Sequence, residues 1–266
     1  MLQPSRTMKN YTLPNGLTIK HANTYETLHL YEDVFGKCAY VNPGTPISEY
    51  LPPDAVVFDC GANIGMFSLF VLQHCPSAWI HAFEPAPATF ELLKANTETH
   101  SRVRINSCGL GAECKQAAFV YLPMATAGSG YYDESVISGM KERLKAAFLS
   151  DDKRPGKELL QYLDKTFEQR VIVPTPVCTL SSYFDDNDIG AVDLLKIDVE
   201  GDERAVLDGI REEHWPRIRQ VVLEVHKAHT GVDSSYQIVC LLAERGYRLR
   251  LVPEEGTLTT IVYGSR

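Results

Sequence analysis

The stretch "VVFDCGANIGMF", residues Val56–Phe67, decides the fold expected for this chain. An apolar run reaches Asp59, then Gly61 and Gly65 follow four residues apart, and a second apolar run begins. A buried strand, a glycine turn and a helix in this order form the first unit of a doubly wound sheet, in which ligands bind beyond the carboxyl ends of the strands. The turn is therefore the first place to expect a ligand.

The rest of the chain repeats the alternation of strand and helix. Apolar strands are predicted at residues 55–60, 78–84, 103–108, 192–198 and 218–226, and helices at 64–74, 87–99, 202–210 and 234–246. Continuous apolar strands that alternate with helices favour a mostly parallel sheet with helices on both faces. Residues 247–252 and 257–264 predict a C-terminal antiparallel hairpin. The expected fold class is α/β, doubly wound.

Two segments lie outside this alternation. Residues 1–50 are expected to form an N-terminal extension packed on a core of residues 51–266, with a hairpin whose turn is Asn15-Gly16. Residues 124–170 are expected to be an insertion of two amphipathic helices, because apolar residues recur there at every fourth position: Val136, Met140, Leu144 and Phe148, then Leu159, Leu163 and Phe167. Two interpretations of the insertion stay open, a lid over the substrate and an oligomer contact that would make a homodimer.

Composition and charge narrow the class of protein. The chain has 266 residues, of which 44% are hydrophobic and 23% charged, as in soluble globular proteins. Its net charge of −8 argues against a nucleic-acid partner. The start of the chain lacks the apolar segment of a signal peptide, and no run is long enough to cross a membrane. Seven scattered cysteines without a C-x-x-C pair predict reduced thiols in a cytoplasmic protein.

The residues of the glycine turn indicate what it binds. Dinucleotide-binding turns carry G-x-G-x-x-G, whereas this turn reads D-x-G-x-N-x-G from Asp59. Asn63 tolerates left-handed backbone angles, so the turn can form, but its side chain crowds the position of a pyrophosphate. The negative charge of Asp59 is expected to repel a phosphate as well. A ligand with a cationic, amino-acid-like end fits better, and S-adenosylmethionine (SAM) has that character.

Three further residues are candidates for cofactor binding. Glu84 ends the second predicted strand, 25 residues after Asp59, where a carboxylate can accept hydrogen bonds from both ribose hydroxyls. Cys108 ends the third predicted strand and Gly109 begins the loop after it, and this region should border the adenine. These two are candidates by position only, and a purely structural turn is the alternative.

Acidic residues and a histidine follow later strands. Asp198 ends the strand predicted at 192–198 and Glu200 follows two residues later. Both are candidate catalytic residues, although Glu200 is also placed to cap the next helix. His226, with Glu224 two residues before it, is a candidate general base. Asp198, Glu224 and His226 are also an alternative set of ligands for a divalent ion. Metal-independent catalysis is the preferred interpretation, and no metal ligand is assigned.

Five segments carry a resemblance to a known family. "FDCGANIGMFS", "HAFEPAPATFELLKAN", "INSCGLG", "LLKIDVEGDERAVLDGI" and "VVLEVH" occur in the order seen in the FkbM family of SAM-dependent methyltransferases, over residues 56–226. The sequence "YEDVFGKCAY" resembles the family's N-terminal region. The resemblance implies a class I, Rossmann-like methyltransferase fold with SAM as cofactor. It also implies these cofactor positions: Asp59, Gly61, Asn63, Gly65 and Glu84.

The expected function is therefore a SAM-dependent O-methyltransferase acting on a hydroxyl of a small molecule, a secondary metabolite or a sugar. Asp198 and His226 are expected to align and deprotonate the acceptor. The insertion at 124–170 is longer than the family pattern, so the acceptor does not follow from the resemblance. Three alternatives stay open: N-methylation of a small molecule, a nicotinamide-dependent oxidoreductase on the same kind of sheet, and a non-catalytic SAM-binding domain.

Overall fold

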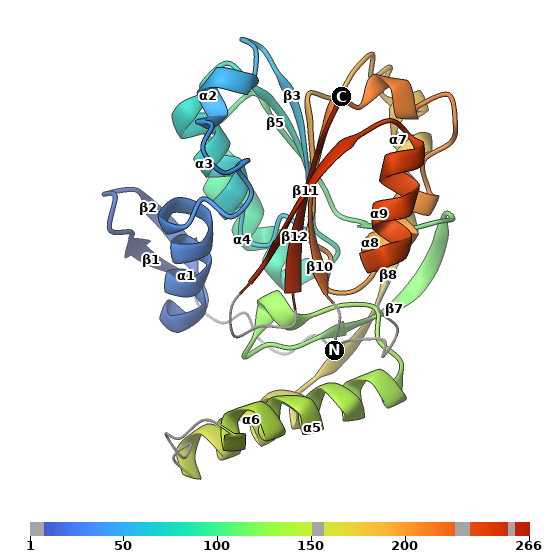
Figure 1. The fold of residues 1–266 in the computed structure, drawn as a ribbon. Coiled ribbons are helices and arrows are strands. Elements are labelled where there is room, and N and C mark those ends of the chain that lie inside the picture. The colour runs from blue at the N-terminus through green and yellow to red at the C-terminus, as the bar shows by residue number, and fades with distance from the viewer. Residues whose placement is uncertain (1–7, 151–156, 227–234, 255–258) are drawn as a thin grey trace.

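The central element of the fold is a seven-stranded sheet. The computed structural model describes residues 8–150, 157–226, 235–254 and 259–266. The strands lie in the order β11-β12-β10-β9-β3-β4-β5 (Figure 1). Their bounds are β3 Val56–Cys60, β4 Trp79–Phe83, β5 Val103–Asn106, β9 Leu194–Ile197, β10 Gln220–His226, β11 Arg248–Pro253 and β12 Thr259–Ser265.

The pairing of these strands confirms the doubly wound α/β class. The neighbouring strands β5, β4, β3, β9 and β10 pair in parallel. Strand β12 is antiparallel to both β10 and β11. The chain moves from β3 to β4 and β5 on one side and returns to β9 and β10 on the other. The strand order therefore reverses between β3 and β9, and ligands of open α/β sheets bind at this switch point.

Helices cover both faces of the sheet, as Figure 1 shows. One face carries α2 Ile47–Tyr50, α3 Met66–His74 and α4 Pro87–Thr97, and the other carries α7 Leu180–Asp186, α8 Glu203–Asp208 and α9 Ser235–Glu244. Helix α3 is buried from Met66 to Leu72, which explains its almost uniformly apolar sequence. It begins at Met66 rather than at the predicted Ile64, because Gly65 with φ 90° is its N-cap.

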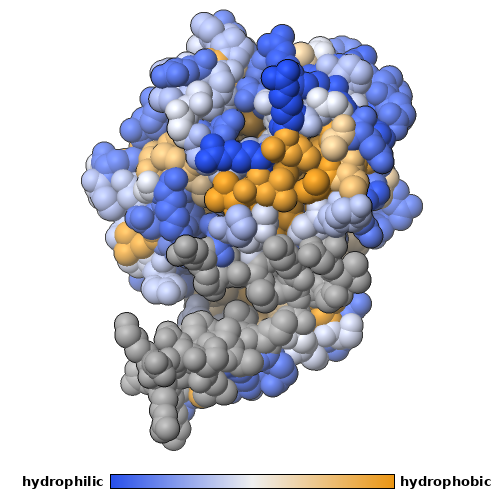
Figure 2. Space-filling view, in the orientation of Figure 1, coloured by the Kyte–Doolittle hydropathy of each residue, from blue (hydrophilic) through white to orange (hydrophobic). Residues whose placement is uncertain are grey.

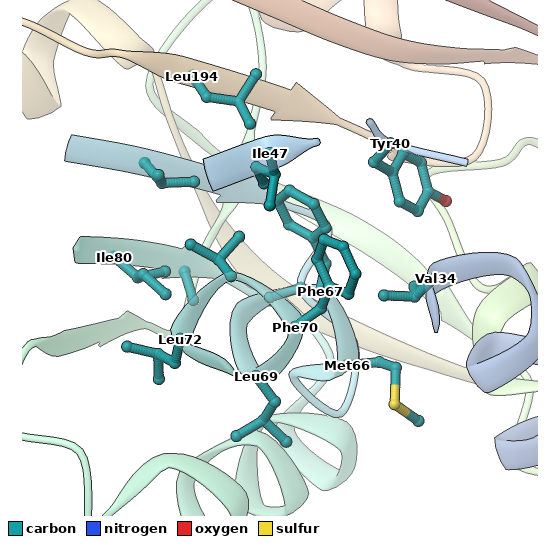
Figure 3. Close-up of a cluster of buried hydrophobic side chains, with 14 of the residues drawn as sticks. Val34, Tyr40, Ile47, Met66, Phe67, Leu69, Phe70, Leu72, Ile80 and Leu194 are labelled. Carbon is teal, nitrogen blue, oxygen red and sulfur yellow. The ribbon is translucent and has the colours of Figure 1, made fainter. Parts of the chain in front are cut away.

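The core lies between these helices and the sheet. Figure 3 shows Phe67, Leu69 and Phe70 of α3 together with Ile80 of β4 and Leu194 of β9. The N-terminal residues Val34, Tyr40 and Ile47 belong to the same apolar cluster. The chain before β3 is thus packed on the layer that supports the glycine turn.

That N-terminal part contains the predicted hairpin and, besides α2, two further helical segments. Its elements are β1 Lys9–Thr12, β2 Thr18–His21, α1 Thr24–Tyr31 and the π-helical turn η1 Glu32–Gly36. Asn23 caps α1 by accepting a hydrogen bond from the backbone N–H of Tyr25. Asn96 of α4 bonds both backbone groups of Lys20 and the carbonyl of Ile64. Asn96 therefore ties the hairpin to the segment that follows the glycine turn.

A second sheet and the predicted helix pair lie beyond the carboxyl ends of the parallel strands (Figure 1). The sheet has the order β6-β8-β7, with β6 Gly109–Leu110, β7 Lys115–Tyr121 and β8 Val171–Cys178. The insertion forms η2 Thr126–Gly128, α5 Glu134–Ser150 and α6 Lys157–Glu168. Lys141 and Lys145 of α5 both lie 2.9 Å from Asp164 of α6. The linker at 151–156 and the side chains of Leu144, Phe148 and Leu159 lie outside the described part.

On the face drawn in Figure 2, an apolar area lies over the edge of the main sheet. Figure 2 shows it near the middle of the face formed by β11 and β12, surrounded by hydrophilic side chains. Leu251 of the edge strand β11 is 46% exposed, and its neighbours Arg248 and Arg250 are exposed charges. Charged side chains on an edge strand discourage pairing with another chain. Among the described helices, none combines the length and apolar composition required to cross a membrane.

Candidate active site

The turn after β3 adopts the left-handed conformation that its sequence predicts. The φ angles are 78° at Gly61, 48° at Asn63 and 90° at Gly65. A Cβ on Gly61 would lie 1.8 Å from the carbonyl oxygen of Asp198, which follows β9. Gly61 is therefore required by the close approach of two strand ends as well as by its φ angle.

Glu84 stands beside this turn at the end of β4. The backbone N–H of Asn63 donates to Glu84 Oε2 at 3.0 Å, and that of Ala86 donates to Oε1 at 2.8 Å. Burial raises the pKa of Glu84 to about 7, although these two hydrogen bonds act in the opposite direction. Each carboxylate oxygen can accept a second hydrogen bond. Glu84 is thus oriented by the backbone and keeps capacity to bind a pair of neighbouring hydroxyls.

A cavity of about 160 Å³ opens between the glycine turn, Glu84 and the end of β9. Among the described residues, its lining includes these acids: Asp33, Glu84, Asp198, Glu200, Asp202 and Glu224. Lys196 is the single Lys or Arg among those lining residues. An excess of carboxylates favours a cationic ligand over a diphosphate. The cavity therefore fits SAM, whose sulfonium and amino groups are cationic, better than a dinucleotide.

Asp59 does not line this cavity, contrary to its expected role in repelling phosphate. The Asp59 carboxylate is fully buried, accepts a hydrogen bond from Ser68 Oγ at 2.7 Å and lies 3.2 Å from Lys196 Nζ. Lys196 Nζ also donates to the Gly61 carbonyl at 2.9 Å and lies 3.4 Å from Asp198 Oδ2. Burial acts to lower the pKa of Lys196, but Asp59 and Asp198 raise it above its ordinary value. The ion pair of Asp59 with Lys196 and the hydrogen bond from Lys196 to the Gly61 carbonyl therefore stabilise the turn.

Tyr40 links two acids at the end of the cavity that β9 and β10 form. Its hydroxyl lies 2.6 Å from Glu224 Oε2 and 3.0 Å from Asp198 Oδ2, and Figure 3 shows this hydroxyl pointing out of the apolar cluster. Lys196 Nζ lies 5.1 Å from the centre of the Tyr40 ring. Burial and the charge of Asp198 raise the pKa of Glu224 to about 8. Sequence reasoning missed Tyr40, which lies 158 residues from Asp198.

His226 ends β10 and is surrounded by carboxylates. Its Nδ1 lies 2.8 Å from Glu203 Oε1, and its Nε2 lies 3.6 Å from both Glu200 Oε2 and Glu224 Oε1. Burial acts to lower the pKa of His226, but Glu200, Glu203 and Glu224 raise it well above the ordinary value. The neutral form, which can accept a proton, is therefore disfavoured. The base role of His226 stays a prediction.

Glu203 and Glu200 have more specific positions than the sequence indicated. Glu203, in the first turn of α8, is fully buried and contacts His226 and the N–H of Gly201. Glu200 lines the cavity with a φ of 56°, which is unusual for a residue with a Cβ. Such outliers cluster at functional sites, where the surrounding structure maintains them.

The opposite end of the cavity is built by the loop after β5 and by the start of the insertion. Cys108, Gly109, Phe119 and Tyr131 line it, and the contact of Cys108 and Gly109 with an adenine stays a prediction. A Cβ on Gly109 would lie 2.1 Å from the Tyr131 hydroxyl, so the glycine makes room for this ring. Neither α5 nor α6 contributes to the lining among the described residues. The insertion thus reaches the cavity through the segment before α5.

The chain is similar to known methyltransferases over most of its length. The family described as Methyltransferase FkbM domain matches residues 59–249. The 31-O-demethyl-FK506 methyltransferase FkbM of Streptomyces tacrolimicus is 37% identical over 257 residues, which cover 96% of this chain and 94% of that protein. Methyltransferase 1 of Beauveria bassiana is 36% identical over 204 residues, which cover 75% and 74%.

Among solved structures, the precorrin-6y C5,15-methyltransferase from Geobacter metallireducens is similar to this chain. The superposition covers 82% of this chain and 85% of the methyltransferase chain, with a TM-score of 0.42 and 11% identity. The family match, which spans well over half of the chain, and the two relatives establish the assignment. This chain belongs to the FkbM family of SAM-dependent methyltransferases.

Proposed function

We propose that the protein is a SAM-dependent O-methyltransferase acting on a hydroxyl of a small molecule, a secondary metabolite or a sugar. The observation that carries this proposal is the pair Asp198 and Glu200 in the cavity lining, with the buried His226 outside the lining and its Nε2 3.6 Å from Glu200 Oε2. A hydroxyl acceptor must lose a proton as it is methylated, whereas a neutral amine needs less help from a base. The name of the 37% identical relative from Streptomyces, which describes an O-methylation, supports the same choice.

The cofactor is proposed to bind along the glycine turn and Glu84. When bound, SAM supplies a methyl group activated by its sulfonium. Glu84 would accept hydrogen bonds from the ribose hydroxyls, and Cys108 would border the adenine. Gly61, Asn63 and Gly65 hold the turn in the conformation that admits the ligand. Asp59 acts through Lys196, which anchors the Gly61 carbonyl.

The acceptor is proposed to bind beside Asp198 and Glu200. Holding the acceptor oxygen in line can contribute about 7–11 kcal/mol, and a general base about 10²–10⁴-fold in rate. Asp198 and Glu200 would orient the hydroxyl, whose proton passes to the neutral form of His226 as the oxygen gains the methyl group. Glu203 fixes the ring of His226 through Nδ1, so that Nε2 is the nitrogen on the side of Glu200 and Glu224.

The test is a methylation assay with a panel of hydroxyl- and amine-bearing small molecules. We expect a product heavier by one methylene unit, with an O-methyl signal in its NMR spectrum and one S-adenosylhomocysteine (SAH) per product. His226→Ala and Asp198→Asn should lower kcat and leave SAH affinity unchanged. The matched control is Asp185→Asn, because Asp185 is a half-exposed aspartate that pairs with Arg211.

Each alternative predicts a different result in the same assay. Methylation of amines alone would identify an N-methyltransferase. SAH binding without methylation, unaffected by the two acceptor-side variants, would favour a non-catalytic domain. NADH binding without SAH binding would favour an oxidoreductase.

Two properties of the whole protein are also proposed. All seven cysteines are free, which supports a reducing compartment such as the cytoplasm. The α5–α6 pair, outside the cavity lining, is proposed as a homodimer contact. Light scattering would show the assembly, and deletion of the helix pair should give monomers.

A further inference from the structure

Three possible metal ligands are brought together by the register of β9 and β10. Leu223 of β10 pairs with Ile197 of β9, so the next residues, Glu224 and Asp198, are neighbours at the carboxyl end of the sheet. His226 lies two residues after Glu224 and therefore projects from the same face of the strand. One ligand atom from each of Asp198, Glu224 and His226 lies within 4.8 Å of the others.

The orientation of His226 matches that of a metal-bound imidazole. Its Nδ1 is occupied by Glu203 Oε1 at 2.8 Å. Its Nε2 is 3.6 Å from oxygens of both Glu200 and Glu224, which is too long for a hydrogen bond. Two atoms bound to the same ion at about 2.0–2.2 Å are separated by about 3.0–3.6 Å. Metal-binding histidines usually donate their second N–H to a carboxylate, the position that Glu203 has here.

Glu203 provides a second observation. It is fully buried behind His226, and its Oε2 has no hydrogen-bond partner within the described part of the chain. A buried carboxylate needs a compensating positive charge. The imidazole of His226 supplies one when it is bound to a metal ion as well as when it is protonated. The same ion would lie beside Glu200 and Glu224, where like charges otherwise repel.

The net charge around Asp198, Glu224 and His226 also favours a bound cation. Asp198, Glu200, Glu203 and Glu224 supply four carboxylates around the single imidazole of His226. Lys196 Nζ lies 3.4 Å from Asp198 Oδ2, but this lysine is shared with Asp59. A divalent ion would therefore compensate an excess of negative charge in a half-buried site. Two carboxylates and an imidazole are ligands that Mn²⁺ and its neighbours in the first transition series accept.

We propose that Asp198, Glu224 and His226 bind a divalent transition-metal ion at the acceptor end of the cavity. The inference rests on the proposed function in one respect, since the ion would hold the acceptor oxygen for methylation. His226 is then a ligand rather than the proton acceptor, and the hydroxyl proton passes to Glu200. Glu203 and Tyr40 are positioning residues, because they contact the ligands.

The experiment is a titration of chelator-stripped protein with MnCl₂, in which the EPR signal reports free Mn²⁺. We expect one Mn²⁺ per chain. Binding should weaken by roughly tenfold or more in Asp198→Asn, Glu224→Gln and His226→Ala, and by about 10–100-fold in Glu203→Gln. Asp185→Asn should retain full Mn²⁺ affinity. SAH affinity, measured in the presence of chelator, shows that each variant is folded.

The result that overturns the proposal is the absence of Mn²⁺ binding to folded, stripped protein, or binding that persists unchanged in Glu224→Gln and His226→Ala. Full methylation activity in chelator-stripped protein would also overturn the proposed metal site, while leaving the proposed O-methyltransferase activity intact. Conversely, a Mn²⁺ site that these variants abolish, in a protein that does not bind SAH, would remove the proposed function and keep the metal site. The two failures are therefore distinguishable.

Discussion

Replacing Lys196 by methionine tests the claim that this lysine holds the glycine turn together. The substitution keeps the length of the side chain and removes its charge. Lys196 Nζ lies 3.2 Å from Asp59 Oδ1 and 3.4 Å from Asp198 Oδ2, and it donates to the Gly61 carbonyl. The side chains of Lys196 and Asp59 are 3% and 0% exposed. Solvent therefore cannot replace the lost charge at Asp59.

The expected loss follows from this burial. Breaking a buried ion pair by removing one partner destabilises a protein by about 3–5 kcal/mol, because the other charge stays buried without compensation. Asp198 is 20% exposed and can be hydrated in part, so Asp59 accounts for most of the loss. We expect Lys196→Met to lower the free energy of unfolding by about 3–5 kcal/mol.

The assay is urea unfolding followed by circular dichroism, and the control is a double-mutant cycle. Asp59→Asn should also destabilise the protein, but the double variant Lys196→Met/Asp59→Asn should be more stable than the sum of the single losses predicts. A loss below about 1 kcal/mol in Lys196→Met, the range of exposed pairs, would refute the reasoning. Losses that add without coupling would show that Asp59 and Lys196 do not act together.

Three further predictions concern the cavity. Glu84 accepts ribose hydroxyls when ionised, so SAH affinity measured by calorimetry should fall as the pH decreases through about 7, and Glu84→Gln should weaken binding and remove this pH dependence. Gly61→Ala should lower stability by about 3 kcal/mol or more in urea unfolding, because its Cβ would lie 1.8 Å from the Asp198 carbonyl oxygen. Tyr40→Phe should lower kcat/KM by about 10–100-fold with SAH affinity unchanged, since it removes the hydroxyl between two acids.

The same three predictions have separate controls. An SAH affinity that is flat between pH 6 and 8 in the unmodified protein would contradict the role of Glu84. Gly190→Ala is the matched control for Gly61→Ala, because a Cβ there would meet nothing within 4 Å, and equal losses in both would reject the packing argument. Tyr40→Phe with normal turnover would exclude a role for the hydroxyl.

The first half of the site could be predicted because its signals are local. The strand, the glycines and Asn63 occur within a few residues, and the backbone angles they require are properties of those residues. Glu84 follows from the next strand in a parallel sheet. The paired insertion helices follow from a four-residue period of apolar side chains, which a helix imposes whatever it packs against.

The contacts between distant segments could not be predicted. The sequence places Glu203 in the first turn of a predicted helix, and only the position of α8 against β10 buries it beside His226. Lys196 lay within a strand that reads as apolar, and its partner Asp59 is on β3. Tyr40 comes from the chain before the main sheet. Each of these contacts depends on tertiary packing rather than on a local pattern.

The second sheet shows another limit. Its strand β8 contains Pro174 and Pro176, which argue against a strand paired on both sides. The structure resolves this because β6 pairs only with Val177 and Cys178, so both prolines face β7 on one side and no strand of the described chain on the other. A short partner strand explains how a proline-containing segment takes the middle place in a sheet.

The most direct measurement is isothermal titration of the unmodified protein with SAH, with NADH titrated in parallel. The acidic cavity beside Glu84 predicts saturable binding of one SAH per chain and no binding of NADH, whose diphosphate would meet the carboxylates. Saturable NADH binding by folded protein that ignores SAH would contradict the account of how this cavity selects its ligand.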